Sequence, residues 1–466
     1  MKKVTVAMTL IVVTIVIIGI SIVSNGSADN DKYIYVATDG SDDQNGTKSE
    51  PYRTLNKAAS EAKPGAMVYV RGGTYKEKLE VEYSGTKQNP VVFQPYKQEE
   101  VVISGKELDN MEGDTALVSI NNQDYITIRG FTLEDLTTDL ADETVMGILV
   151  TGSSSHITLE NNHIRQVETH ADGGNAHGVA VYGTGPMTDI TVSHNTVEDL
   201  QLGASEALVL NGNIDGFNVE GNMVRHNDNI GIDLIGYEGI SPERDYVRNG
   251  SVKNNVIHDI SSYGNPAYGE DYSAGGIYVD GGKNITIEEN TIYHSDIGIE
   301  VASEHAGKYA DQIKILHNTV YDNFYTGISI GGYDEERGGT KNSIISKNVL
   351  YRNDTVGLGG GQLLMQHDTK DNIIEKNILT AGPSNLFIAN YFKTNEGNTL
   401  SRNVFHKEKD KAAVWVWKDE AITTFSDFKT ASNSDAQTSY INLDYIDPEK
   451  GDFRLAESNL IKEIIE

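Results

Sequence analysis

Acidic side chains recur at one position of a short repeated motif, here called the Gly-Ile phrase. In it a glycine and an isoleucine begin a strand whose side chains alternate between its two faces. Asp233 and Glu300 each follow such a Gly-Ile pair, and Tyr278 and Asp280 follow the pair between them. If these phrases stack as neighbouring strands in register, Asp280 lies roughly 8 Å from both Asp233 and Glu300 at the backbone. That separation leaves room for a water molecule between two carboxyl groups, as inverting glycoside hydrolysis requires. We therefore expect Asp280 and Glu300 to be the general acid and base, with Asp233 as a third carboxylate.

Inserted loops bring further polar side chains to the same edge of the predicted strands. Loops on one side of a regular scaffold usually build its binding site. Tyrosines in such loops offer sugars a flat apolar surface and a hydroxyl group. His177 and Glu206 immediately precede neighbouring strands and can pair across coils. The predicted substrate-binding residues are His177, Glu206, Tyr268, Glu270, Asp271, Tyr272, Glu304 and His305.

Two other interpretations of the acidic patch stay open. The chain has 68 Asp and Glu residues, so three carboxylates on one outward face can be ordinary solvated surface. Alternatively the patch binds Ca²⁺, with Asp228 and Asp233 as hard oxygen ligands. A divalent cation would also relieve the repulsion between the carboxylates. Hydrolysis by two carboxylates requires no cofactor.

A second repeated phrase sets the fold. Two or three β-forming residues, a polar pair, an asparagine and another apolar residue recur every 26 to 35 residues. Such a period predicts a solenoid, and the alternation of apolar residues predicts short strands, so we expect an all-β parallel β-helix. The asparagine can occupy the bend in a left-handed conformation and bond to its counterpart one coil away. The repeated asparagines are Asn162, Asn195, Asn222, Asn255, Asn290, Asn318, Asn348, Asn377 and Asn403.

The composition of the chain argues against some classes of partner and site. Its 466 residues carry a formal charge of -30, which repels phosphate backbones and makes nucleic acid an improbable partner. There is no cysteine, so thiolate zinc sites and thiol nucleophiles are excluded. Lys2 and Lys3 precede an uncharged apolar run from residue 4 to 23, which predicts a signal peptide or signal anchor within 1–30. We expect the rest to be exported as a monomer, extracellular or held at the cell surface by this anchor.

Both ends of the repeat region have the features of caps. After the leader, residues 31–123 hold an N-terminal cap and the first coils, 124–403 hold the β-helix repeats, and 404–466 form an irregular C-terminal cap. Apolar residues at helical spacing follow Thr54, which predicts a short capping helix. Beyond residue 404 the asparagine phrase stops, and Trp415, Trp417, Phe425 and Phe428 cluster in the segment that we expect to cover the last coil.

The exported part carries a recognisable set of short motifs near its start. They are Tyr35-Val36, Asp39-Gly40, Gly46-Thr47, Pro51-Tyr52-Arg53-Thr54, Pro64-Gly65 and Val70-Arg71-Gly72-Gly73-Thr74-Tyr75. Together with the repeats, this pattern resembles right-handed parallel β-helix proteins related to family-nine pectate lyases, over nearly the whole exported chain. The resemblance implies a right-handed coil. It says little about the reaction, because folds of this kind host lyases, glycoside hydrolases, epimerases and non-enzymes.

The catalytic motifs of that lyase family are incomplete in this chain. The family's Asp-Asp-Gly-x-Asp calcium motif corresponds to residues 229–233, where Asp233 is the one aspartate of the three that is present, and Tyr278 stands where the catalytic lysine would be. This departure argues against a strict pectate lyase, because removing a proton beside a uronate needs a base and a cation that neutralises the carboxylate. Tyr278 could be that base only if a nearby cation lowered its pKa.

These features predict an exported carbohydrate-active enzyme that cleaves the glycosidic bonds of a polysaccharide bound along one face of the β-helix. One alternative is a polysaccharide lyase or epimerase that acts on a uronate polymer with Ca²⁺, using Tyr278 or a loop Arg or Lys in place of the missing lysine. The other alternative is a non-catalytic cell-surface protein that binds glycan.

Overall fold

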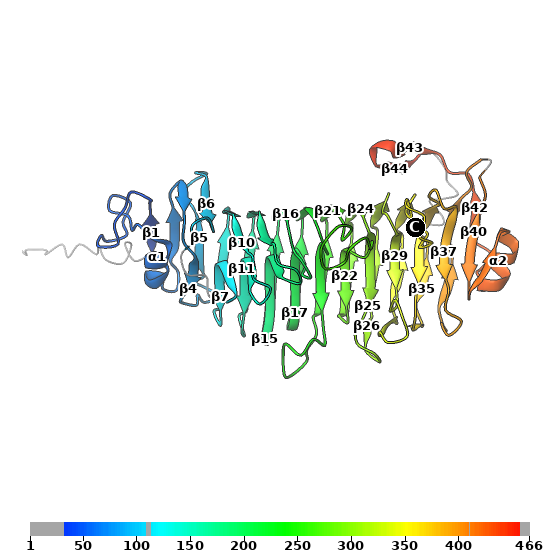
Figure 1. Cartoon of the computed structure of the whole chain (residues 1–466), viewed down its shortest axis with the longest axis horizontal. Helices are drawn as coiled ribbons and strands as arrows, with labels where there is room; N and C mark the ends of the chain where they lie inside the picture. Colours follow the sequence, from blue (N-terminus) through cyan, green and yellow to red (C-terminus); the bar gives the residue numbers. More distant parts are fainter. Residues whose placement is uncertain (1–31, 109–112, 410, 457–466) are drawn as a thin grey trace, which may run out of the picture.

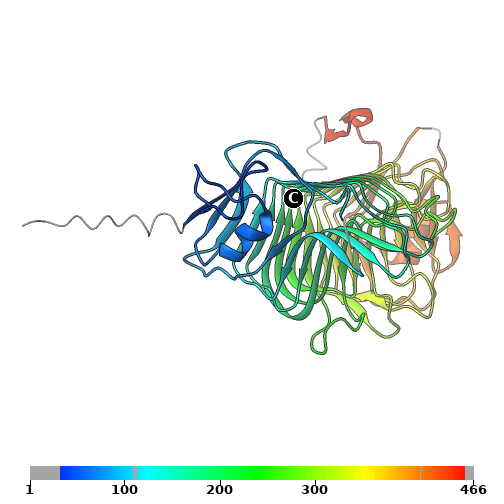
Figure 2. The ribbon, with the colours of Figure 1, turned by 60° about the vertical axis from the view of Figure 1, so that its left-hand side comes forward.

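The fold was analysed in a computed structural model, which describes residues 32–108, 113–409 and 411–456. Short strands coil around one long axis and stack on the next turn, so the molecule is a parallel β-helix of about 13 turns (Figures 1 and 2). Three stacks of strands, here called faces 1, 2 and 3, surround the interior.

Each face is a ladder of parallel strands. Face 1 comprises β4 (Leu79–Val81), β7 (Thr115–Asn121), β11 (Thr144–Thr151), the first parts of β15 (Asn175–Ser193) and β17 (Leu208–Glu220), β19 (Ile232–Ile235), β22 (Gly275–Asp280), β25 (Ile297–Ala302), β29 (Thr326–Ile330), β33 (Leu363–Met365), β37 (Leu386–Asn390) and β40 (Val414–Trp417), with β41 (Glu420–Ile422) antiparallel to β40. Face 2 comprises β1 (Tyr33–Val36), β2 (Met67–Val70), β5 (Val91–Pro95), β8 (Ile126–Arg129), β12 (Ile157–Glu160), the second parts of β15 and β17, β20 (Arg248–Lys253), β23 (Lys283–Glu288), β26 (Tyr309–Asp311), β27 (Lys314–Leu316), β30 (Gly339–Lys341), β31 (Ile344–Ser346), β34 (Thr369–Lys370), β35 (Ile373–Glu375) and β38 (Thr399–Ser401).

Face 3 contributes one strand to each turn. Its strands are β3 (Gly73–Tyr75), β6 (Val101–Ser104), β9 (Thr132–Glu134), β13 (His163–Arg165), β16 (Thr196–Leu200), β18 (Met223–Asn227), β21 (Val256–Ile260), β24 (Thr291–Ser295), β28 (Thr319–Tyr321), β32 (Val349–Tyr351), β36 (Ile378–Thr380), β39 (Val404–His406) and β42 (Ser439–Ile441). Two separate pairs complete the described strands: β10 (Leu136–Thr138) with β14 (Val167–Thr169), and β43 (Tyr445–Asp447) with β44 (Asp452–Leu455).

The interior of the coil is filled by stacked aliphatic side chains. The isoleucine of each Gly-Ile phrase points inward and lies over its counterpart in the next turn; Ile232, Ile277, Ile299 and Ile328 are all fully buried. Burying one such side chain is worth about 1.5–3 kcal/mol, so the column is a main source of stability. Because the isoleucines are fixed inside, the residues on either side of each must point outward.

The glycine that opens the phrase is required by the close approach of successive turns. A Cβ atom on Gly231 would stand 2.6 Å from the carbonyl oxygen of Gly276, and one on Gly276 would stand 2.9 Å from that of Gly298. Real Cβ atoms do not approach backbone oxygen so closely. A side chain here would push two turns apart at the start of face 1.

The asparagine ladder is present, with one correction to its geometry. Each ladder asparagine is buried and bonds to the next; for example, Asn255 Nδ2 donates to Asn290 Oδ1 at 2.9 Å and Asn222 Nδ2 donates to Asn255 Oδ1 at 3.0 Å. The amide bonding is therefore confirmed. The left-handed residue, however, is the one before the ladder position, such as Asn254 with φ 55° or Glu289 with φ 56°. The ladder side chain must point inward to reach its neighbours, so the preceding, outward residue makes the turn.

Helices lie only near the two ends of the described chain. α1 (Leu55–Glu61) begins after Thr54, whose hydroxyl accepts a hydrogen bond from the Lys57 amide at 3.1 Å, and it packs at the β1 end of the solenoid (Figure 1). α2 (Phe425–Ser432) lies at the other end, where Phe428 stacks on Trp415 with ring centroids 5.2 Å apart. The predicted leader, 1–30, lies outside the described residues. Among those that are described, no helix is long and apolar enough to cross a membrane.

Candidate active site

The acidic residues lie in one column of face 1, as the stacking of the phrases predicts. Asp233 on β19 pairs with Tyr278 on β22, which pairs with Glu300 on β25, so the three occupy consecutive turns. Asp280 lies two residues beyond Tyr278 and pairs with Ala302. The labelled strands β17, β22, β25 and β29 follow one another along the middle of the solenoid (Figure 1).

These carboxyl groups point outward from the barrel but are not solvated. Asp233 is only 2% exposed, Asp280 3% and Glu300 8%. The interpretation of the patch as ordinary solvated surface is therefore wrong. The side chains are buried because loops on either side of the strands cover the column. The pattern of strands alone does not reveal these loops.

Burial and mutual repulsion raise the pKa of every carboxyl group in the cluster. The pKa of Glu300 rises to about 8, first because of burial and then because of the charges of Glu304 and Asp280. The pKa values of Asp233 and Asp280 are raised well above their ordinary value, again mainly by burial. The charged neighbours that raise these pKa values are themselves acids, including Glu206 beside Asp233. At least one carboxyl group of the cluster thus stays protonated near neutral pH.

Asp280 differs from Glu300 in its hydrogen bonds. The backbone amide of Glu304 donates to Asp280 Oδ1 at 2.7 Å, which favours the ionised form, whereas no hydrogen bond from a protein donor to the Glu300 carboxyl group was found among the described residues. This bond offsets only part of the burial that raises the pKa of Asp280, but it gives Asp280 a donor that stabilises its anion, which Glu300 lacks.

Glu304 connects the column to a cation. Its Oε1 accepts a hydrogen bond from the Tyr278 hydroxyl at 2.9 Å, and its Oε2 accepts one from Arg337 Nε at 2.7 Å. The pKa of Tyr278 is raised well above its ordinary value by burial and by the surrounding carboxylates. Tyr278 therefore lacks the lowered pKa that a catalytic base would need, and its hydroxyl holds Glu304 instead.

The predicted pair of His177 and Glu206 is formed across two turns. His177 Nδ1 donates to the backbone carbonyl of Glu206 at 2.9 Å and lies 3.6 Å from its carboxylate, and the Tyr182 hydroxyl lies 2.9 Å from His177 Nε2. Burial lowers the pKa of His177 to about 4 and raises that of Glu206 to about 7. His177 is buried and its ring nitrogens face protein groups, so it supports Glu206 rather than lying open to a ligand.

The loop between β21 and β22 reaches over the column. Asp296 clamps both ends of this loop, because its carboxylate accepts hydrogen bonds from the amides of Ser262 (2.8 Å) and Ala274 (3.0 Å). Inside the loop, Tyr268 is partly buried, and its pKa is raised by burial and then by the charges of Glu206, Asp233 and Glu304, so its hydroxyl lies near the cluster.

Other predicted binding residues lie further out. The Tyr272 ring stacks on Tyr263 with centroids 4.7 Å apart, which forms an aromatic surface beside the loop. Glu270 and Asp271 are exposed on the same loop. His305 Nε2 lies 2.9 Å from the Glu238 carboxylate and so joins the loop after β19 to the one after β25.

The acidic residues fit a calcium site of the lyase type poorly. Asp228 does not join Asp233: its Oδ1 accepts a hydrogen bond from the Leu202 amide at 2.6 Å. Burial raises the pKa of Asp228 to about 6, and the acid that adds to this shift is Glu168. Within the described ranges, no three carboxylates offer oxygen atoms within 4.8 Å of one another. We therefore assign no catalytic step to calcium.

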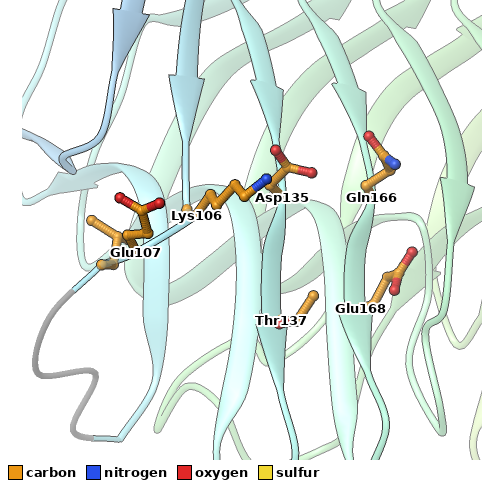
Figure 3. A pocket seen from close by; sticks show the side chains of 8 residues that line it. Lys106, Glu107, Asp135, Thr137, Gln166 and Glu168 are labelled. Carbon is orange, nitrogen blue, oxygen red and sulfur yellow. The ribbon is translucent and has the colours of Figure 1, made fainter.

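The cavity drawn in Figure 3 lies away from this cluster. Its volume is about 440 Å³ and it lies where face 3 turns toward face 1, with Lys106, Asp135, Gln166 and Glu168 among its lining residues. A second hollow of about 480 Å³ shares Glu168 and continues along the same corner to His226 and Asp259. This corner thus forms a polar trough separate from the carboxylate column.

Several site residues were missed by the sequence reasoning. Asp296, Glu238 and Arg337 hold the loops or the carboxylates in place. Asp296 could have been noticed, because it directly precedes β25 and lies two residues before its Gly-Ile phrase. The others lie in loops whose course the repeats do not determine.

Comparisons with known proteins agree with the fold. Residues 34–233 match the family described as Pel9A-like, right handed beta helix region, and residues 235–429 match the right handed beta helix region family. The uncharacterized protein YwoF of Bacillus subtilis strain 168 is 54% identical over 441 residues, which is 95% of this chain and 94% of that protein. Pectate lyase PEL9 of Emericella nidulans is 39% identical over 93 residues, 20% of this chain and 22% of the relative.

Solved structures show the same architecture at low identity. Lacto-N-biosidase of family GH136 from Eubacterium ramulus is 14% identical, with a TM-score of 0.52 over 80% of this chain and 64% of that one. Pectate lyase Pel9A is 15% identical, with a TM-score of 0.48 over 92% of this chain and 90% of that one. The repeats, the three-faced coil and the two family matches together assign the chain to the pectate-lyase-like right-handed parallel β-helix family.

Proposed function

We propose that this protein is an exported hydrolase that cleaves the glycosidic bonds of a neutral polysaccharide. The observation that carries the proposal is the buried column on face 1, in which Asp233, Asp280 and Glu300 lie on adjoining turns with raised carboxyl pKa values. Similarity to carbohydrate-active enzymes, such as the GH136 lacto-N-biosidase and the matched part of pectate lyase PEL9, supports the substrate class.

In the proposed reaction Glu300 is the acid and Asp280 the base. With a pKa of about 8, the Glu300 carboxyl group keeps its proton at neutral pH and donates it to the glycosidic oxygen as the C–O bond breaks. Asp280 acts in its ionised form, which the hydrogen bond from the Glu304 amide stabilises, and accepts a proton from the water that attacks the anomeric carbon. Because their strands are neighbours, their backbones are roughly 8 Å apart, and inverting enzymes keep the two carboxyl groups roughly 6.5–9.5 Å apart, which supports the proposal. Asp233, whose pKa is raised by burial and then by Glu206, Asp280 and Glu300, is the third carboxyl group of the cluster.

The charge of the site favours a neutral substrate over a uronate. The residues that perturb the cluster most are acids, and Arg337, the cation nearest to them in the hydrogen-bond network, is already bonded to Glu304. A uronate carboxylate bound over Asp233 and Asp280 would be repelled. A sugar without charge has no such cost, and Tyr268 with the Tyr263–Tyr272 stack can pack against its ring.

The test is to incubate the full chain with neutral and acidic polysaccharides, with and without chelator, and to follow reducing ends and ultraviolet absorbance. We expect new reducing ends without unsaturated product. Asp280→Asn and Glu300→Gln should each lower the rate by about 10²–10⁴-fold. Glu289→Gln is the matched control, since Glu289 is an exposed acid at the turn of the same solenoid region.

The other outcomes are distinct. Unsaturated products from a uronate polymer that disappear with chelator would replace hydrolysis by the lyase alternative, and uronate conversion without cleavage would indicate an epimerase. Glycan retention without new chain ends, unchanged in Asp280→Asn, would indicate a binding protein.

We also propose that the apolar segment in 1–30 exports the chain and leaves it extracellular or attached to the membrane as a monomer. Fractionation of cells into cytoplasm, membrane and medium tests this. Recovery of the chain in the cytoplasmic fraction would contradict it.

A further inference from the structure

A cluster of histidine and aspartate side chains lies on face 3, well separated in the fold from the carboxylate column of face 1. His226 is on β18, and His258 and Asp259 are on the next turn, β21. The three residues each offer one ligand atom, and these atoms all lie within 4.8 Å of one another. In the part of the chain that the structure describes, this is the one group of three such residues with that property.

The geometry is close to that of a zinc site. His258 Nδ1 lies 2.6 Å from Asp259 Oδ2, and His226 Nε2 lies 3.5 Å from the same oxygen. Around a tetrahedral zinc with bonds of about 2.0–2.1 Å, ligand atoms lie roughly 3.4 Å apart. Small side-chain rotations would therefore bring all three atoms to bonding distance.

The surroundings orient the histidines for metal binding. The second ring nitrogen of His226, Nδ1, lies 3.4 Å from Asp199 Oδ1, so that carboxylate can hold Nδ1–H and leave Nε2 free as a ligand. The His258 ring is fixed by stacking on Tyr293, with centroids 4.7 Å apart and planes 7° from parallel. His258 is largely buried, whereas His226 is about half exposed.

Backbone conformation presents these side chains in one line. Asp199, His226, Asp259 and His294 each have φ between 50° and 55°, at the same place in successive strands of face 3. This left-handed kink costs energy for residues other than glycine, asparagine or aspartate. At each kink the strand turns its side chain outward, beside those of the neighbouring turns.

We propose that His226, His258 and Asp259 bind a first-row divalent metal of the zinc class. Two imidazoles and one carboxylate suit Zn²⁺ or Co²⁺, whereas Ca²⁺ and Mg²⁺ prefer oxygen ligands alone. The fourth position faces the polar trough of about 480 Å³ that His226 and Asp259 line, so water or a ligand oxygen can complete the site.

The competing explanation is a ladder of hydrogen bonds and ion pairs that needs no metal. His294 Nδ1 lies 3.4 Å from the other oxygen of Asp259, so histidines and aspartates alternate along the line. The metal site requires His258, which lies beside the line, whereas the ladder does not. The metal site also predicts selectivity among divalent cations.

The test is titration calorimetry of the chelator-treated full chain with Zn²⁺, together with the visible absorption of the Co²⁺ form. We expect one saturable site per chain that a large excess of Ca²⁺ or Mg²⁺ does not occupy, and Co²⁺ bands typical of tetrahedral nitrogen and oxygen ligation. Asp199→Asn should weaken binding by about 10–100-fold, because it removes the group that orients His226. His226→Ala and His258→Ala should each remove the site.

His294→Ala is the matched control, since it removes a histidine from the same line but none of the three ligands; its affinity should stay within about threefold of the parent. Circular dichroism checks that each variant is folded. Should His258→Ala fail to fold, the Co²⁺ spectrum of the parent and the Asp199→Asn affinity still decide. The proposal is overturned if the parent binds no Zn²⁺ saturably, or if His226→Ala keeps the parent's stoichiometry and affinity.

Discussion

Replacing Glu300 by glutamine should stabilise the fold while it removes the proposed activity. Below pH 4.5 this carboxyl group is protonated in both the unfolded and the folded chain, so it causes no pH-dependent loss. As the pH rises, the unfolded chain ionises first, whereas the folded site holds its proton until about pH 8. The stability of the folded chain therefore falls between these values, by about 1.4 kcal/mol per pH unit, and the penalty above them is about 5 kcal/mol.

Glutamine cannot ionise, so Glu300→Gln escapes this penalty. Its amide has a desolvation cost of roughly 1–3 kcal/mol, but that cost does not vary with pH. The free energy of unfolding of the variant, minus that of the parent, should thus increase by about 4 kcal/mol between about pH 5 and about pH 9. Urea unfolding of the full chain, followed by circular dichroism at several pH values, measures this difference.

Asp435→Asn is the control of opposite sign. Burial alone would raise the pKa of Asp435, but hydrogen bonds from the Arg402 amide and from Thr438 lower it overall. Its contribution to stability is present above the unfolded pKa of 3.8 and lost as the pH falls, so the cost of Asp435→Asn should be constant from about pH 5 to about pH 9. A flat difference for Glu300→Gln over the same interval would refute the reasoning, since it would mean that Glu300 ionises normally in the folded chain.

Three further predictions concern the scaffold and the chemistry. Asn255→Ala should lower the free energy of unfolding by about 3–5 kcal/mol, because it leaves the Val219 carbonyl and the Asn222 amide without their buried partners. Asn161→Ala at the exposed turn should cost only about 1–2 kcal/mol, the penalty of a left-handed alanine, and equal losses in urea unfolding would contradict the ladder's role. The cleavage rate should fall as the pH rises through about 8, when Glu300 loses its proton, and a rate that instead rises there would exclude it as the acid. Chelator treatment should change the rate of glycan hydrolysis less than twofold, since two carboxylates suffice; complete loss of cleavage would point to a metal-dependent reaction.

The stacking of face 1 could be predicted because it depends on a few strong constraints. The inward isoleucines and the glycines that precede them allow only one register, which places Asp233, Tyr278 and Glu300 on consecutive turns. The burial of these side chains could not be predicted, because it depends on loops that fold back over them. Asp296 holds one such loop through hydrogen bonds to two amides, a contact between residues far apart in sequence.

The histidine cluster of face 3 could also have been predicted from the repeat. His226, Asp259 and His294 each follow a ladder asparagine by four residues, so the offset alone places them in one line. That reasoning needs the left-handed kink, which turns the side chain outward at this position. The sequence reasoning assigned left-handed geometry to the ladder asparagine itself and did not identify this second bend.

In each turn the ladder asparagine and the Gly-Ile phrase align with their counterparts in the next turn. The number of residues between them therefore does not affect how the faces align. Successive ladder asparagines are joined by hydrogen bonds whether they are 26 or 35 positions apart in the sequence. A loop can therefore gain or lose many residues while the strands before and after it keep their partners. Such a scaffold can acquire a different specificity by exchanging one insertion at a time, since no change in one turn has to be compensated in the next.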